Sequence, residues 1–231
     1  MYRIVSIDEE KESLLGYSPE KADDFHIESA KSANKKFDQE LKKIKNKKVI
    51  LMCGGSASGK TEFIEKFCLA SNETKTEDLE GLIFDSTLAT ELGAKVKIEK
   101  IIRSKNIPVI YFIFPKNIKR CFAAFQNRER KIPENRFFET HSGARRIALW
   151  IAKNYQKVEI AIYQNELVDK SNVNLDFEEE FFEKKSISEI NLKNIDLKYY
   201  LSEFSSNHEM IEFLESIQFS VEELQQQIEK L

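Results

Sequence analysis

The chain has 231 residues, of which 41% are hydrophobic, and its formal net charge is −3 at pH 7. This composition supports a packed core and excludes a chain that is disordered throughout. The weak acidity argues against a dedicated nucleic-acid-binding protein. No apolar run approaches the ~20 residues of a membrane span, and residues 1–10 show no signal-peptide core. The cysteines Cys53, Cys68 and Cys121 share no metal or disulfide spacing, so we expect a cytoplasmic protein without membrane contact.

The first part of the chain predicts a short strand and then one long helix. Residues 3–7 form the candidate strand. Ser18, Pro19 and Glu20 have the pattern of a helix N-terminus, with a capping side chain, a proline and a first-turn acid. We therefore expect a helix over residues 18–45. Its apolar stripe has three- to four-residue spacing and contains Ala30, Ala33, Phe37, Leu41 and Ile44.

Residues 54–61, GGSASGKT, match the phosphate-binding loop pattern G-x-x-x-x-G-K-[ST] at every position. An apolar run at 48–53 predicts a buried strand before the loop, and residues 62–68 predict an amphipathic helix after it. Backbone amides in such a loop surround a polyphosphate, and the helix dipole favours its charge. Lys60 would contact the β- and γ-phosphates, and Thr61 would ligate Mg²⁺. The loop therefore predicts binding of ATP or GTP with Mg²⁺ by Gly54, Gly55, Ser56, Ala57, Ser58, Gly59, Lys60 and Thr61.

Strands and helices alternate beyond the loop. Residues 71–79 are polar and predict a loop. The later predicted strands cover 82–85, 109–114 and 158–163. The predicted helices cover 93–105, 118–125 and 140–153, and the first of them turns Ala94, Ile98, Ile101 and Ile102 inward. This order predicts an α/β fold in residues 1–165, a P-loop kinase-like three-layer sandwich with a mainly parallel sheet.

The last part of the chain has a weaker pattern. Residues 175–184 are acidic and rich in Phe. Short helical patterns occur near 195–204, 208–216 and 219–230. We expect residues 166–231 to form a helical C-terminal extension that packs on the core.

Asp85 is the main candidate for acid–base chemistry. It ends the predicted strand 82–85, at the carboxyl edge of the sheet where ligands of such folds bind. A carboxylate there can deprotonate an attacking hydroxyl or hold Mg²⁺. The structural alternative is a helix cap, which Gly93 and the gap before the next helix make less natural. The adjacent Ser86 and Thr87 fit phosphate binding and simple turn chemistry equally well.

The arginine-rich segment 128–136 lies between two predicted helices, after the strand 109–114. Planar guanidinium groups match the charge that develops on the oxygens of a transferring phosphoryl group. Arg128 follows Cys121 by seven residues on an apolar helix face and should point inward. We therefore expect Arg128 and Arg130 to close over the phosphate as a lid.

The next predicted helix contains two further pairs of interest, His141 with Arg145 and Ser142 with Arg146. The two members of each pair lie one helical turn apart and so share a face of the helix. Each pair fits the wall of a substrate pocket or an ordinary packed or exposed helix face. The neighbouring Trp150 fits core packing better than base stacking.

The motifs GGSASGKTEF, IFDSTL, PVIYFIF and NRERKIPE occur in an order that resembles the zeta toxin family of P-loop kinases. The resemblance covers residues 18–163 and includes the helix before the loop. It implies a kinase that transfers a phosphate from ATP or GTP to a hydroxyl. In the toxins proper the acceptor is a UDP-activated amino sugar, and an antitoxin protein blocks the nucleotide site. An antitoxin is therefore a partner that the resemblance implies.

The chain departs from that family just after the phosphate loop. Zeta toxins have a strand there that ends in an acidic segment with the catalytic Asp. Here only residues 71–81 separate the loop helix from the IFDSTL strand, which matches a later family strand. Asp85 is accordingly either a relocated base or not the base.

The leading hypothesis is an ATP-dependent kinase with a small-molecule hydroxyl acceptor, a metabolite or a nucleotide-sugar. Lys60, Asp85, Arg128 and Arg130 would act on the phosphate, and Thr61 with Asp85 would hold Mg²⁺. A first alternative is a 5′-hydroxyl polynucleotide kinase, because residues 119–146 carry eight Lys or Arg and three Glu. The acidic net charge argues against this nucleic-acid partner. A second alternative is a catalytically inert ATP-binding interaction protein.

Overall fold

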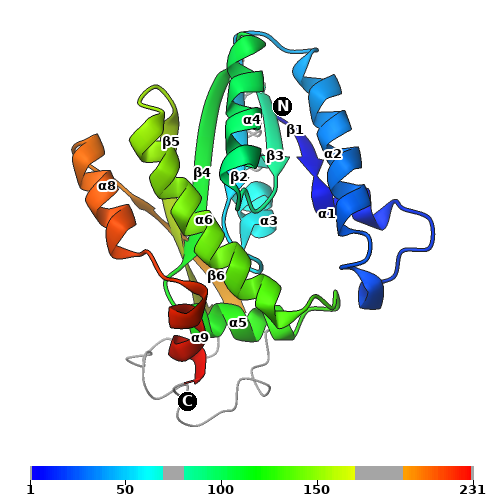
Figure 1. Ribbon diagram of the computed structural model, residues 1–231, viewed down its shortest axis with the longest axis vertical. Helices are drawn as coiled ribbons and strands as arrows, with labels where there is room; N and C mark the ends of the chain where they lie inside the picture. Colours follow the sequence, from blue (N-terminus) through cyan, green and yellow to red (C-terminus); the bar gives the residue numbers. More distant parts are fainter. Residues whose placement is uncertain (1, 70–80, 170–194, 230–231) are drawn as a thin grey trace.

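The computed structural model describes residues 2–69, 81–169 and 195–229, which form an α/β fold (Figure 1). Its six-stranded sheet has the order β1-β3-β2-β4-β5-β6. All neighbours pair in parallel except β5 and β6, which are antiparallel. The strands are β1 (Tyr2–Ser6), β2 (Lys48–Cys53), β3 (Gly81–Asp85), β4 (Ile107–Pro115), β5 (Glu159–Asp169) and β6 (Ile195–Ser202).

Helices pack on both faces of the sheet, which is compatible with a three-layer α/β sandwich. One face carries the larger apolar cluster and four helices, α2 (His26–Leu41), α4 (Glu91–Arg103), α6 (Glu134–Asn154) and α8 (Asn207–Ser216). On the other face, α3 (Lys60–Phe63) and the π-helical turn Ile64–Leu69 bury Phe63 and Ile64. The expected mainly parallel sheet is confirmed.

A third apolar cluster lies between helices that Figure 1 places beyond the end of the sheet. It joins α5 (Ile118–Gln126), the first turns of α6 and α9 (Val221–Glu229). The ring of Phe137 packs against those of Phe122 and Phe125, at centroid distances of 5.1 and 5.2 Å. This cluster fixes α5 and α6 relative to each other at the point where the arginine-rich segment joins them.

The long N-terminal helix expected over 18–45 is wrong in its extent. Pro19–Lys21 form a 3₁₀ turn, Ser18 makes no side-chain cap, and α2 begins only at His26. The carbonyl of Pro19 accepts a hydrogen bond from Lys131 N (2.9 Å), a contact from the arginine-rich segment that competes with helix continuation. A short helix that was not expected, α1 (Ile7–Glu12), follows β1 directly.

The helix expected near 195–204 is also wrong, because residues 195–202 form strand β6. Leu197 and Tyr199 alternate with the polar Asp196 and Lys198 and the exposed Tyr200, a period of two that suits a strand. β6 pairs with the second half of β5, which extends past the predicted end at 163. The expected boundary at 165 therefore falls inside β5, and the described strand after it, β6, belongs to the same sheet. The predicted patterns at 71–79 and 175–184 lie outside the described residues.

Smaller differences concern the helices. α6 begins at Glu134, six residues before the expected start, and Ile102 of α4 is 51% exposed rather than inward. Trp150 packs beside the main core as expected. The helices expected at 208–216 and 219–230 are present as α8 and α9. Among the described residues, none of the helices is long and apolar enough to cross a membrane.

Candidate functional site

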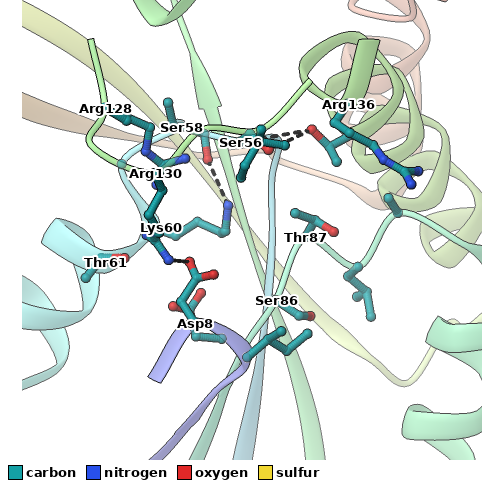
Figure 2. Close-up of a pocket in the computed structure, with 18 of the residues that line it drawn as sticks. Asp8, Ser56, Ser58, Lys60, Thr61, Ser86, Thr87, Arg128, Arg130 and Arg136 are labelled. Atoms are coloured by element: carbon teal, nitrogen blue, oxygen red, sulfur yellow. Dashed lines mark hydrogen bonds and ion pairs between the residues drawn. The ribbon is translucent and has the colours of Figure 1, made fainter. Parts of the chain in front are cut away.

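A cleft of about 1050 Å³ opens where β2 and β3 end. Its walls come from the loop residues 56–62, the end of β3 with the residues that follow it (84–90), helix α1, the segment 124–132 and helix α6. This is the carboxyl edge of the parallel strands, the place where α/β sheets bind ligands. Figure 2 shows side chains from several of these elements converging on one centre.

The loop after β2 has the backbone that its glycines permit. Gly59 lies in the left-handed region with φ 83°, immediately before α3. A Cβ on Gly59 would lie 2.6 Å from the Tyr199 hydroxyl, and a Cβ on Gly55 would lie 2.3 Å from the ring of His141. Both positions therefore exclude a side chain, and the loop backbone is pressed closely against its neighbours.

Helices α5 and α6 hold the first half of the loop. His141 Nε2 lies 2.9 Å from Ser56 O, Thr140 Oγ1 accepts from Ser56 N (3.1 Å), and the Cys121 thiol donates to Ala57 O (3.3 Å). Burial holds the pKa of His141 well below its ordinary value, so the ring is neutral and Nε2–H is the donor to the carbonyl. His141 therefore supports the loop rather than lining the cleft.

Strands β5 and β6 hold the second half of the loop. Asn165 Nδ2 donates to Ser58 O, and the Tyr199 hydroxyl donates to Gly59 O (2.5 Å). The Tyr199 ring packs against Phe63, the first buried aromatic of α3, at a centroid distance of 5.2 Å. The loop is thus held from both sides by hydrogen bonds within the protein.

Lys60 folds over the loop. Its Nζ donates to Gly54 O (3.0 Å) and Gly55 O (2.8 Å). Burial lowers the pKa of Lys60, and the nearby carboxylate of Asp85 opposes this shift. The ammonium therefore lies inside the cleft in contact with the loop carbonyls.

Two carboxylates at the carboxyl edge of the sheet have pKa values that are shifted in opposite directions. Asp85, at the end of β3, is 9% exposed, and burial raises its pKa to about 6 against the pull of Lys60. Ser6 Oγ lies 3.5 Å from its Oδ2, across the β1–β3 pair. Burial would also raise the pKa of Asp8, but Arg130 and Lys11 more than offset it and hold that pKa below its ordinary value. Asp8 is therefore ionised at neutral pH, whereas the pKa of Asp85, about 6, lies close to neutral pH.

Arg128 and Arg130 turn into the cleft from the segment between α5 and α6, toward Lys60 and Asp8 (Figure 2). Arg130 Nη1 lies 2.7 Å from Asp8 Oδ2, an ion pair that ties this segment to α1. Burial and the charge of Arg130 lower the pKa of Arg128. The buried ammonium of Lys11 lies 3.7 Å from Asp8 Oδ1.

The predicted site residues come together in this cleft. The cleft is lined by Lys60, Thr61, Asp85, Arg128 and Arg130, and by the loop residues Ser56, Ala57, Ser58 and Gly59. The first two loop residues, Gly54 and Gly55, are buried and do not line it. Among the later arginines, Arg146 lines the cleft and Arg145 is buried.

Asp8 and Lys11 are the residues that sequence reasoning missed. The available signal was the candidate strand at 3–7, because an acid directly after a parallel strand lies at the ligand-binding edge. What the sequence did not reveal is that this strand joins the same sheet beside β3.

The described residues contain no group of three or more His, Cys, Asp or Glu placed to hold a metal. Mg²⁺ in phosphoryl-transfer sites commonly uses one or two protein oxygens together with substrate phosphates. Thr61 and Asp85 both line the cleft and fit that smaller requirement.

The chain matches none of the protein-family models and none of the curated proteins with which it was compared. Fold and site together define an α/β protein whose phosphate-loop sequence borders a cleft lined by paired charges. A more specific assignment is a proposal.

Proposed function

We propose that the protein is a P-loop kinase of the zeta toxin-like type, which transfers the γ-phosphoryl group of ATP or GTP to a hydroxyl of a small acceptor. One observation carries this proposal. Asp85, Arg128 and Arg130 converge with Lys60 on one cleft beside residues 54–61. Phosphoryl transfer needs that set: a phosphate cradle, cations for the developing charge and a carboxylate for the attacking hydroxyl.

The residues present fit a triphosphate. The loop 54–61 leads directly into α3, and a helix N-terminus favours a bound anion. Four cations, Lys11, Lys60, Arg128 and Arg130, lie around two carboxylates, which leaves an excess of positive charge for an anion. The loop and Lys60 would hold the phosphates, with Mg²⁺ bound directly by Thr61 and through water by Asp85. When bound, the nucleotide supplies the phosphoryl group and Mg²⁺ neutralises its charge.

Asp85 is the residue best suited to accept a proton from the acceptor. A general base works best with a pKa near the working pH, and burial brings that of Asp85 to about 6. Asp8 has the opposite environment and stays ionised in its pair with Arg130. Carboxylates with divergent pKa values at one site commonly have separate roles. Asp8 would therefore orient Arg130, and Asp85 would receive the proton at a carboxylate oxygen.

The position of Asp8 is relevant to the segment in which this chain differs from zeta toxins. Zeta toxins are expected to bring an acidic segment on a strand after the loop helix. In this chain β1, from the N-terminus, lies on the outer side of β3, and Asp8 follows it. A second acid thus reaches the same edge of the sheet by a different route along the chain.

The polynucleotide kinase alternative has less support. It rested on the basic residues of 119–146, but Arg120 and Arg145 are buried, with 7% and 4% exposure. Arg128 and Arg130 turn into the cleft. Few of these cations remain to form an outer surface for a nucleic-acid backbone. The inert alternative leaves the costly burial of Lys60 and Asp85 beside each other unexplained.

Phosphate transfer from γ-labelled ATP tests the proposal, across a panel of hydroxyl metabolites and 5′-hydroxyl oligonucleotides. We expect labelled small-molecule product with the wild type and a loss of roughly 10²-fold or more in Lys60→Ala. Lys42→Ala, which changes an exposed lysine at the end of α2 that does not line the cleft, serves as control. Equal transfer by wild type and Lys60→Ala contradicts the mechanism. Label only on oligonucleotides selects the first alternative, and tight ATP binding without any product selects the second.

A further inference from the structure

The carbonyl oxygens of residues 54–59 all accept hydrogen bonds from side chains of the protein. Lys60 Nζ donates to the first two, at 3.0 and 2.8 Å. The donors to the next four, in chain order, are His141 (2.9 Å), the Cys121 thiol (3.3 Å), Asn165 and the Tyr199 hydroxyl (2.5 Å). These four donors do not line the cleft, whereas residues 56–59 do. The four carbonyls are therefore held on the side of the loop away from the ligand space.

The direction of these carbonyls determines the direction of the loop amides. In a planar trans peptide, the C=O of one residue and the N–H of the next point in opposite directions. A donor behind Ser56 O therefore turns the amide of Ala57 toward the cleft, and the other three donors act in the same way on the amides that follow. Successive amides that converge form an anion-binding concavity. The donors behind the loop thus set the conformation in which it can hold a phosphate.

His141 is buried directly against the loop, with 1% exposure. A Cβ on Gly55 would lie 2.3 Å from its ring, and its Nε2 lies 2.9 Å from Ser56 O. The neighbouring Thr140 accepts a hydrogen bond from Ser56 N (3.1 Å). Two consecutive residues of α6 therefore bind both backbone groups of Ser56, and the imidazole ring leaves no room for a side chain at position 55.

Arg145 restricts His141 to a single ring proton. It follows His141 by one turn of α6, is 4% exposed, and its Nη1 donates to His141 O (3.2 Å). Within the described ranges Arg145 has no ion pair that would offset its charge. Burial and this charge both hold the pKa of His141 well below its ordinary value. A neutral ring carries one N–H, and the bond to a carbonyl assigns it to Nε2.

We propose that His141 is a positioning residue for nucleotide binding: its Nε2–H holds the Ser56 carbonyl away from the cleft and so keeps the Ala57 amide turned toward the phosphates. His141 acts through the loop backbone and does not touch the nucleotide. This role differs from the pocket wall considered for His141 and Arg145 from the sequence, because neither residue lines the cleft. The inference rests on the proposed function, because the ligand of the loop is the nucleoside triphosphate of that proposal.

Two amide substitutions at position 141 test the role of the Nε2 donor. The Gln amide nitrogen is as far along the side chain as His Nε2, whereas the Asn amide is one bond shorter and does not reach Ser56 O. Calorimetric titration of the full-length protein with a non-hydrolysable ATP analogue and Mg²⁺ measures Kd. We expect His141→Gln to stay within about threefold of wild type, and His141→Asn to bind roughly tenfold or more weakly, because Ser56 O loses its donor. In transfer assays KM for ATP should follow Kd, while kcat changes little. His208→Asn is the matched control, because His208 is an exposed histidine on α8.

The outcomes separate this inference from the proposed function. Failure of the wild type to bind the analogue overturns the proposed function, whatever the variants do. If the wild type binds, equal Kd values in wild type and His141→Asn overturn the positioning role. Equal losses in His141→Gln and His141→Asn overturn it as well, because the shape of the ring would then matter and not its donor. Circular dichroism checks folding, and His141→Met, which has the length of Gln without a donor, replaces His141→Asn if that variant does not fold.

Discussion

The hydroxyl of Tyr199 lies 2.5 Å from the carbonyl oxygen of Gly59, so the last strand of the sheet holds the last glycine of the phosphate loop. The same carbonyl accepts the first helical hydrogen bond of α3, from Phe63 N (3.0 Å). Strand β6, in the part of the chain expected to be a helical extension packed on the core, therefore contacts the candidate site. Its contribution can be isolated because the hydroxyl is a single atom on a ring that packs independently.

Tyr199→Phe should weaken ATP binding and leave the fold intact. The aromatic ring keeps its contacts with Phe63, and Gly59 O keeps its bond from Phe63 N. Loss of one net hydrogen bond corresponds to roughly a two- to tenfold higher Kd. Calorimetric titration with ATP measures it, and KM for ATP should rise while kcat changes little. Tyr200→Phe, on the neighbouring exposed residue, is the control. An unchanged Kd in Tyr199→Phe, with only a lower Tm, would show that the contact is purely structural.

The Asp8–Arg130 pair should behave as one unit in catalysis. If Asp8 acts by orienting Arg130, its carboxylate has no further effect once the guanidinium is gone. We expect Asp8→Asn and Arg130→Gln each to lower kcat/KM by roughly tenfold or more, with the double variant close to Arg130→Gln alone. A coupling energy of about 1 kcal/mol or more in the double-mutant cycle would show that Asp8 acts through Arg130.

The exposed pair Arg103–Glu99 on α4 provides the matched cycle, because its 2.8 Å contact joins a surface arginine and carboxylate outside the cleft. Exposed helical pairs of this kind couple by only about 0.3–0.5 kcal/mol in stability, and this one should leave transfer unchanged. Losses at Asp8 and Arg130 that simply add would mean that Asp8 acts on the substrate directly.

The local features of this site could be predicted from the sequence, whereas its long-range contacts could not. The strand, loop and helix around residues 48–63 carry their signal in adjacent residues, because glycine conformations and apolar periodicity are local. Asp8 reaches Asp85 through the pairing of β1 with β3, whose facing residues Ser6 and Asp85 are 79 positions apart. No local pattern encodes which strands become neighbours. Tyr199 was missed for a different reason, because the segment that forms its strand was predicted as a helix.

Transfer should depend on the ionisation of Asp85. With a pKa of about 6, this base is protonated in acid and free to accept a proton above that pH. We expect kcat/KM for ATP, which reports the free enzyme, to rise with pH through about 6 and then level off. The acidic limb should disappear in the residual activity of Asp85→Asn. Persistence of the same limb in that variant would assign it to another group.

The buried charge of Asp85 should also cost stability. Its pKa is raised from 3.8 to about 6 on folding, so between these values the folded state binds more protons than the unfolded state. The free energy of unfolding then falls as pH rises through this window, and the penalty is complete above the folded pKa. Asp85→Asn removes the charge and keeps the shape. It should be more stable than wild type at neutral pH by roughly 1–3 kcal/mol, and nearly equal to it below the ordinary pKa. Urea unfolding at both pH values measures this, with the exposed Asp24→Asn as control. A variant that is less stable than wild type at neutral pH would mean that Lys60 stabilises the Asp85 carboxylate by more than burial destabilises it.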